Sequence, residues 1–151
     1  MKLIFVDIDG PLATDECGKR EETKWGSIYR MNPKCVEVLN EILRETDADL
    51  VLSSDWRLYW TLEQIGEIFE WNGIIKKPVG MISNENVKMF DLEINRIHQI
   101  STYLNEHKPE KWVAFDDLNL KSKKVPNFVL CDSIDGLCGE NVKELILKFI
   151  K

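Results

Sequence analysis

Four short runs of mainly apolar residues alternate with stretches in which apolar positions recur every three or four residues. The runs cover residues 3–6, 48–52, 111–115 and 128–131, and they favour buried strands. Helical spacing occurs over 33–45, after Thr61, over about 90–106 and over 141–150. This alternation predicts an α/β domain with a mostly parallel central sheet.

Two segments stand outside the alternation. Residues 13–30 are polar and mixed in charge, with one tryptophan, Trp25, and they predict a hairpin or a loop. Residues 73–80 predict a second loop. Because the chain has no internal repeat and no evident domain boundary, we expect residues 1–151 to form a single domain.

Composition and charge argue against several classes of protein. Hydrophobic residues make up 44% of the chain and charged residues 30%, as in globular proteins. No apolar run has membrane-spanning length and the N-terminus does not resemble a signal peptide, so we expect a cytoplasmic protein. The net charge of −6 argues against broad non-specific binding to nucleic acid, but leaves room for a local basic site. The chain has no CxxC pair, so we do not expect the cysteines to bind zinc. In a cytoplasmic protein they are expected to be reduced thiols: Cys17, Cys35, Cys131 and Cys138.

The first apolar run ends in two carboxylates, Asp7 and Asp9, followed by Gly10-Pro11. Side chains two residues apart on an extended segment lie on the same side, so these carboxylates can converge. Acids that lie so close repel each other, and a divalent cation relieves the repulsion. The alternative is an ordinary Asp-Gly turn without chemistry.

Two later strands also end in polar residues. Residues 53–57 (Ser-Ser-Asp-Trp-Arg) offer hydroxyls and a guanidinium, which suit a phosphate group. The run at 111–115 ends in Asp116-Asp117. Each feature alone also fits a turn or a cap, but the carboxyl ends of parallel strands face one crevice, where α/β sheets bind ligands. The sequence therefore predicts one site with acidic and phosphate-binding parts.

As a set, these motifs resemble the haloacid dehalogenase-like (HAD) hydrolase superfamily, most of whose members are magnesium-dependent phosphatases. Its first motif, an apolar strand ending in D-x-D-G-x-L, is matched by residues 7–12, with Pro11 in place of the more usual Val or Thr. The second motif is matched by residues 50–53 and the fourth by residues 116–117. The third supplies a basic residue on the preceding helix. Arg96 fits best there, and the alternatives are Lys88, Lys108 and Lys111.

A narrower resemblance spans nearly the whole chain. Residues 52–57 (LSSDWR), 96–104 (RIHQISTYL) and 112–117 (WVAFDD) are similar to small HAD domains associated with multi-domain RNA-repair proteins. Asp55 stands where a small hydroxyl residue is more common. The resemblance implies a three-layer Rossmann-like fold, and the short segments between the motifs leave room for only a minimal cap.

The resemblance also implies a mechanism. Asp7 is expected to attack phosphorus as nucleophile and form an aspartyl-phosphate. Asp9 is expected to protonate the leaving group and then activate water. Ser53 or Ser54, together with Arg96, is expected to bind the phosphoryl oxygens.

The cofactor implied in the same way is Mg²⁺. Its expected ligands are Asp7, the backbone carbonyl of Asp9 and Asp116, with Asp117 assisting the acidic cluster. An open site would admit a phosphate on a bulky substrate, namely a nucleotide, a nucleic-acid end or another phosphomonoester. Nine basic and aromatic residues either form a rim around this site or are scattered over the surface and the core. They are Lys19, Arg20, Lys24, Trp25, Trp56, Arg57, Trp60, Lys76 and Lys77.

Two other functions fit parts of the pattern. Signalling receiver domains also combine an acidic cluster with Mg²⁺, but their paired acids follow the first strand, whereas here D-x-D comes first. A weakly active or inactive HAD-like domain that binds or regulates a partner is the second alternative. Intact acids at the motif positions count against it. The oligomeric state is left open.

Overall fold

The computed structural model describes residues 1–84, 91–120 and 125–151. Its centre is a five-stranded sheet with the order β5-β4-β1-β6-β7, in which every pairing is parallel. The strands are β1 (Lys2–Val6), β4 (Asp49–Leu52), β5 (Gly80–Met81), β6 (Lys111–Asp116) and β7 (Phe128–Leu130). The expected α/β fold with a parallel sheet is therefore confirmed.

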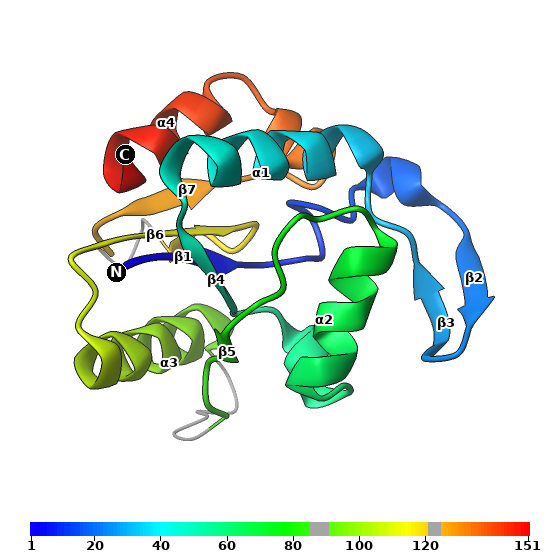
Figure 1. Ribbon diagram of the computed structural model, residues 1–151, viewed down its shortest axis with the longest axis horizontal. Helices are drawn as coiled ribbons and strands as arrows, with labels where there is room; N and C mark the ends of the chain where they lie inside the picture. The colour runs from blue at the N-terminus through cyan, green and yellow to red at the C-terminus, as the bar shows by residue number, and fades with distance from the viewer. Residues whose placement is uncertain (85–90, 121–124) are drawn as a thin grey trace.

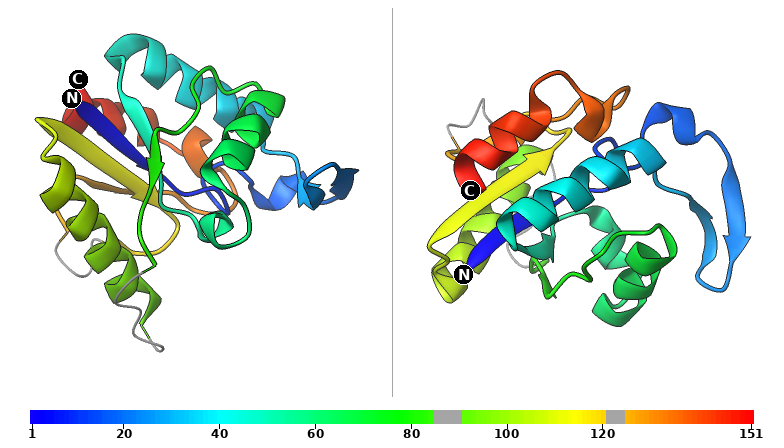
Figure 2. Two further views of the ribbon diagram at one scale, coloured as in Figure 1. Left: turned by 60° about the horizontal axis from the view of Figure 1, so that its bottom comes forward. Right: turned by 45° about the horizontal axis from the view of Figure 1, so that its top comes forward.

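Helices cover both faces of the sheet and complete three layers (Figures 1 and 2). One face carries α1 (Pro33–Thr46) and α4 (Val142–Ile150), and the other carries α3 (Leu92–His107). Side chains of α2 (Leu62–Trp71) join the core cluster that contains α1. None of the helices in the described parts of the chain is long and apolar enough to cross a membrane.

β1, the central strand of the sheet, is buried on both faces. Ile4 and Val6 belong to the larger core cluster, beneath α1 and α4, whereas Leu3 and Phe5 belong to a smaller cluster with Ile100 of α3. Side chains of a strand point alternately to opposite faces, so a strand covered by helices on both faces reads as a continuous apolar run. This burial accounts for the run at residues 3–6 and fixes the position of the residue that follows it.

The polar segment 13–30 contains an antiparallel hairpin, β2 (Arg20–Thr23) and β3 (Gly26–Tyr29), which projects from the rest of the fold (Figure 1). Trp25 in its turn packs edge-on against Trp71 of α2, with ring centroids 5.7 Å apart. The indole Nε1 of Trp25 donates to Glu67 Oε2 at 2.9 Å. The hairpin is thus attached to α2 through its turn, where Lys24 also pairs with Glu67 at 3.3 Å.

One expected loop contains a strand. Residues 73–80 were expected to be a loop, but Gly80 begins the two-residue strand β5, which pairs with β4. Two residues are too few to produce an alternating pattern, so sequence reasoning had no signal for this strand.

Both ends of the chain lie beside the start of β6, at the amino edge of the sheet (Figure 2). The carbonyl of Met1 accepts a hydrogen bond from the backbone N–H of Glu110 at 3.0 Å. The carbonyl of Lys151 accepts one from Lys111 Nζ at 2.9 Å. Because the strands are parallel, the carboxyl ends of β1, β4 and β6 all lie at the opposite edge.

Candidate active site

Three carboxylates converge at the carboxyl ends of β1 and β6. Asp7 follows β1, Asp116 ends β6, and Asp117 comes next; one oxygen of each lies within 4.8 Å of the others. The register that places Val6 beside Phe115 brings Asp7 and Asp116 to the same level of the sheet. Carboxylate oxygens are the ligands that Mg²⁺ prefers, so this donor set fits a divalent cation.

Burial and mutual repulsion favour protonation within this cluster. Burial, followed by the charge of Asp116, raises the pKa of Asp7 well above its ordinary value, while Arg96 opposes the shift. Burial likewise raises the pKa of Asp116 to about 6. A divalent cation would favour the ionised carboxylates, so the cluster is electrostatically suited to a cation as well as geometrically.

Gly10 allows Asp117 to approach the end of β1. Its φ is +103°, a conformation that glycine adopts readily and other residues do not. A Cβ atom added at Gly10 would lie 2.8 Å from the Cβ of Asp117. The glycine of the first motif therefore makes space for an acid of the fourth.

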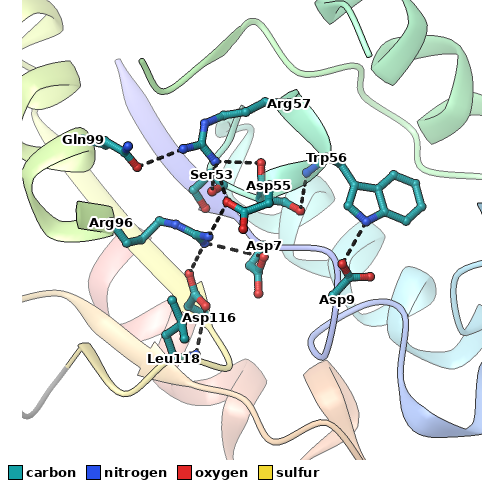
Figure 3. A network of polar contacts seen from close by, with 11 residues as sticks. Asp7, Asp9, Ser53, Asp55, Trp56, Arg57, Arg96, Gln99, Asp116 and Leu118 are labelled. Carbon is teal, nitrogen blue, oxygen red and sulfur yellow. Dashed lines mark hydrogen bonds and ion pairs between the residues drawn. The ribbon is translucent and has the colours of Figure 1, made fainter. Parts of the chain in front are cut away.

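Asp9 lies apart from the three converging carboxylates. Its Oδ2 accepts a hydrogen bond at 3.0 Å from the indole Nε1 of Trp56 (Figure 3). Trp56 is buried and belongs to a short 3₁₀ helix, η2 (Asp55–Leu58), directly after β4. Partial burial raises the pKa of Asp9, and the hydrogen bond from Trp56 offsets part of that rise. The expected roles of the Asp9 carboxylate and carbonyl remain predictions.

The contact between Trp56 and Asp9 was missed by sequence reasoning, which considered Trp56 only as a rim or core aromatic. No local pattern links residues 47 positions apart. The useful signal would have been that Trp56 follows a strand end expected to lie beside Asp9.

Ser53 and Ser54 follow β4 beside β1, and both are buried. The backbone N–H of Ser53 donates to the Val6 carbonyl at 2.9 Å, but its Oγ has no partner among the described residues. Ser54 Oγ accepts from the N–H of Trp56 at 3.3 Å and so caps η2, and Ser54 also borders the cleft. A buried hydroxyl without a partner is costly, so Ser53 is the serine with unused hydrogen-bonding capacity.

Arg96 extends from α3 to the acidic cluster. Its Nη1 donates to Asp116 Oδ2 at 2.6 Å and lies 3.6 Å from Asp7 Oδ1. Burial acts to lower the pKa of Arg96, but the charges of Asp116 and Asp7 outweigh it and raise the pKa. The structure thus brings the basic residue chosen from the sequence next to the proposed nucleophile.

Of the alternatives to Arg96, the two that lie in the described residues are far from the carboxyl ends of the strands or outside the cleft lining. Lys108 follows the end of α3, and Lys111 begins β6 at the amino edge of the sheet. Lys88 lies outside the described residues.

Arg57 of η2 is a second buried arginine beside Arg96. Its Nη1 donates to the carbonyls of Ser53 and Ser54 at 3.1 and 3.0 Å, and its Nη2 donates to Gln99 Oε1 at 2.9 Å. Burial lowers the pKa of Arg57, and the charge of Arg96 adds to that effect. The site therefore holds two fixed guanidiniums. The sequence indicated both, Arg57 as a group suited to phosphate and Arg96 as the basic residue of the third motif.

A cleft of about 260 Å³ opens over these groups, and its polar lining includes Asp7, Asp9, Arg57, Arg96 and Asp117. Exposed leucines border it, Leu58 from η2 and Leu92 from α3.

The expected basic and aromatic rim is mostly absent from this cleft. Of the residues proposed for it, Arg57 is the one that lines the cleft within the described structure. Lys76 instead binds Asp47 Oδ1 at 2.7 Å near the amino end of β4, and Lys24 pairs with Glu67 of α2. For Lys24 and Lys76 the structure therefore agrees with the alternative, in which these residues are scattered over the surface.

Comparison with protein families agrees with this geometry. The family model for the HAD domain in Swiss Army Knife RNA repair proteins matches residues 3–142, a range that contains the acidic cluster, both serines and both arginines. Comparisons with curated proteins and with solved structures gave no match. The family match spans most of the chain, and the chain therefore belongs to the HAD domains of Swiss Army Knife RNA repair proteins.

Proposed function

We propose that this chain is a Mg²⁺-dependent phosphatase that hydrolyses a phosphomonoester through an aspartyl-phosphate on Asp7. The observation that carries the proposal is the convergence of Asp7, Asp116 and Asp117 within 4.8 Å beside an open cleft. Asp9 lines the same cleft and is held by Trp56. Together these residues supply the nucleophile, the acid and the anionic ligands that the reaction needs.

Two aspartates do the covalent and proton-transfer chemistry. An Asp7 oxygen attacks phosphorus while the bond from phosphorus to the leaving oxygen breaks, and Asp9 donates its proton to that oxygen. The ionised Asp9 then takes a proton from the water that attacks the aspartyl-phosphate, which frees Asp7 and inorganic phosphate. The raised pKa of Asp9 supports its role as the acid.

The remaining residues bind Mg²⁺ and the phosphoryl group and neutralise their charges. When bound, Mg²⁺ supplies positive charge that keeps the carboxylates ionised and stabilises charge on the phosphoryl oxygens. Asp7, the Asp9 carbonyl, Asp116 and Asp117 would hold it. Arg96, with Ser53 or Ser54, orients the phosphoryl group, and the unpartnered hydroxyl of Ser53 supports its share in this role.

The substrate that we propose is a phosphorylated nucleic-acid end or a nucleotide. The family description, which names RNA repair proteins, supports this choice. An accessible cleft bordered by exposed leucines also suits a phosphate carried on a large molecule.

The test is a phosphatase assay with Mg²⁺ over p-nitrophenyl phosphate, mononucleotides, phosphosugars, and oligonucleotides phosphorylated at the 3′ or the 5′ end. Asp7→Asn is expected to abolish hydrolysis, and Asp9→Asn to slow it by about 10²–10⁴-fold. Removal of Mg²⁺ with a chelator is expected to stop the reaction.

A matched control is Asp49→Asn, which removes one carboxylate charge at the other end of β4 and is expected to leave the rate unchanged. Activity that survives Asp7→Asn would rule out the proposed nucleophile. Failure of every substrate would favour the HAD-like domain that binds without catalysis.

A further inference from the structure

The carboxylate of Asp55 bridges the two arginines of the cleft. Its Oδ1 accepts from Arg57 Nη1 and from Arg96 Nη2, each at 3.2 Å (Figure 3). The Asp55 side chain is 59% exposed, whereas those of Arg57 and Arg96 are 5% and 8% exposed. The carboxylate therefore lies on the solvent side of two buried guanidiniums.

Both guanidiniums are fixed without Asp55. Arg57 is held by two backbone carbonyls and by Gln99. Arg96 is held by Asp116 and lies close to Asp7. If the Asp55 side chain rotated into water, the two cations would stay in place with one face uncovered.

Rotation of Asp55 has a low cost. The Asp55 carboxylate is largely exposed, so water solvates its charge when its two ion pairs break. A phosphoryl group offers more acceptor oxygens to the same planar donors than one carboxylate does. An incoming phosphate can therefore replace Asp55 on the arginines.

We propose that Asp55 is a built-in competitor of the substrate, which occupies the face of Arg57 and Arg96 that an incoming phosphoryl group uses. The inference rests on the proposed function and adds a residue that sets affinity at the same site. An anion binds by displacing the Asp55 carboxylate, so this residue weakens phosphate binding and speeds the release of inorganic phosphate. It also makes Arg57, in addition to Arg96, a phosphate-binding residue.

The test measures binding of inorganic phosphate by calorimetry in the presence of Mg²⁺. Asp55→Asn and Asp55→Ser are expected to lower the Kd for phosphate by roughly three- to tenfold, because the competing charge is gone. The control Asp49→Asn removes the same charge from the amino end of β4, where Lys76 keeps Asp47 as a closer partner, and is expected to leave the Kd unchanged.

The alternative is that Asp55 holds the arginines in position for binding. Phosphate binding that is weaker in both folded Asp55 variants would establish that alternative and overturn the proposal. Unchanged binding in the variants, or no binding in either the wild type or the variants, would also overturn the proposal. Thermal unfolding shows that each variant is folded. Calorimetry needs no turnover, so a protein that binds phosphate but hydrolyses no ester would contradict the proposed function and not this inference.

Discussion

Asp7 lies within reach of two acids and one guanidinium, while Asp9, two residues later, bonds to an indole. Neighbouring aspartates of the same motif thus have different surroundings. Asp7 lies among carboxylates that could hold a cation, whereas Asp9 lies outside that cluster and is partly desolvated. This difference supports the roles that we propose, with Asp7 as the nucleophile and Asp9 as the acid.

At Gly10 the prediction concerns the cation site. Gly10→Ala is expected to displace Asp117, to weaken Mg²⁺ binding at least severalfold and to cost about 1–3 kcal/mol of stability. The physical reasons are the left-handed φ and the 2.8 Å approach of a Cβ atom to Asp117. Titration calorimetry gives the Mg²⁺ affinity and urea unfolding gives the stability.

A control for Gly10→Ala is available in the hairpin. Gly26 has a similar φ of +107°, but a Cβ there meets nothing within 4 Å. Gly26→Ala is expected to lose stability and to keep its Mg²⁺ affinity. Equal Mg²⁺ affinity in the wild type and Gly10→Ala would show that Asp117 does not depend on this glycine.

At the scale of elements, the β2–β3 hairpin and α2 are joined by the aromatic turn residue Trp25. We expect Trp25→Ala to release the hairpin, because the packing on Trp71 and the hydrogen bond to Glu67 are both lost. The loss of stability is expected to be about 1–2 kcal/mol. Limited trypsin digestion checks this, since Arg20 and Lys24 in the hairpin should be cut faster.

Two further variants separate the contributions of Trp25. Trp25→Phe keeps the ring against Trp71 and Glu67→Gln keeps an acceptor for the indole, so both are expected to protect the hairpin better than alanine does. Identical digestion of the wild type and Trp25→Ala would mean that other contacts hold the hairpin.

The elements that the sequence predicted correctly are those whose bounds depend on residues close by in the chain. The helix that begins at Pro33 has Asn32 as its cap, and Thr61 caps α2 with a reciprocal bond from Gln64. The apolar runs became strands because both faces of the sheet are covered. The short strand β5 was missed because its two residues depend on β4 for their pairing.

At the scale of the whole molecule, the acidic cluster opposes folding when no cation is present. An acid whose pKa is raised in the folded state keeps its proton there and loses it in the unfolded chain, so stability falls as pH rises from the unfolded to the folded pKa. For Asp116 that window runs from about 4 to about 6. The burial of Asp7 acts in the same direction.

We therefore expect metal-free protein to lose up to about 3 kcal/mol of stability between pH 4 and pH 6 through Asp116. The quantity to measure is the difference in unfolding free energy between wild type and Asp116→Asn, because the titration of groups that do not interact with Asp116 cancels. Added Mg²⁺ is expected to remove the decline. A difference that is constant or that rises over this window would contradict the raised pKa.

The sequence predicted which strand ends form the site, but not which side chains contact each other there. Asp7, Ser53 and Asp116 were brought together because parallel strands align their carboxyl ends, which is a property of the topology. The bond from Trp56 to Asp9 and the position of Asp55 between two arginines depend on how η2 turns after β4. Such side-chain geometry is set by tertiary packing and leaves no periodic pattern in the chain.

The placement of Met1 and Lys151 beside the start of β6 has a practical consequence. A polypeptide fused to either terminus leaves the fold on the side away from the acidic cluster. The domain can therefore be tethered to a surface, or spliced into an exposed loop of a host protein through two adjacent junctions, while the edge that carries the cleft still faces outward.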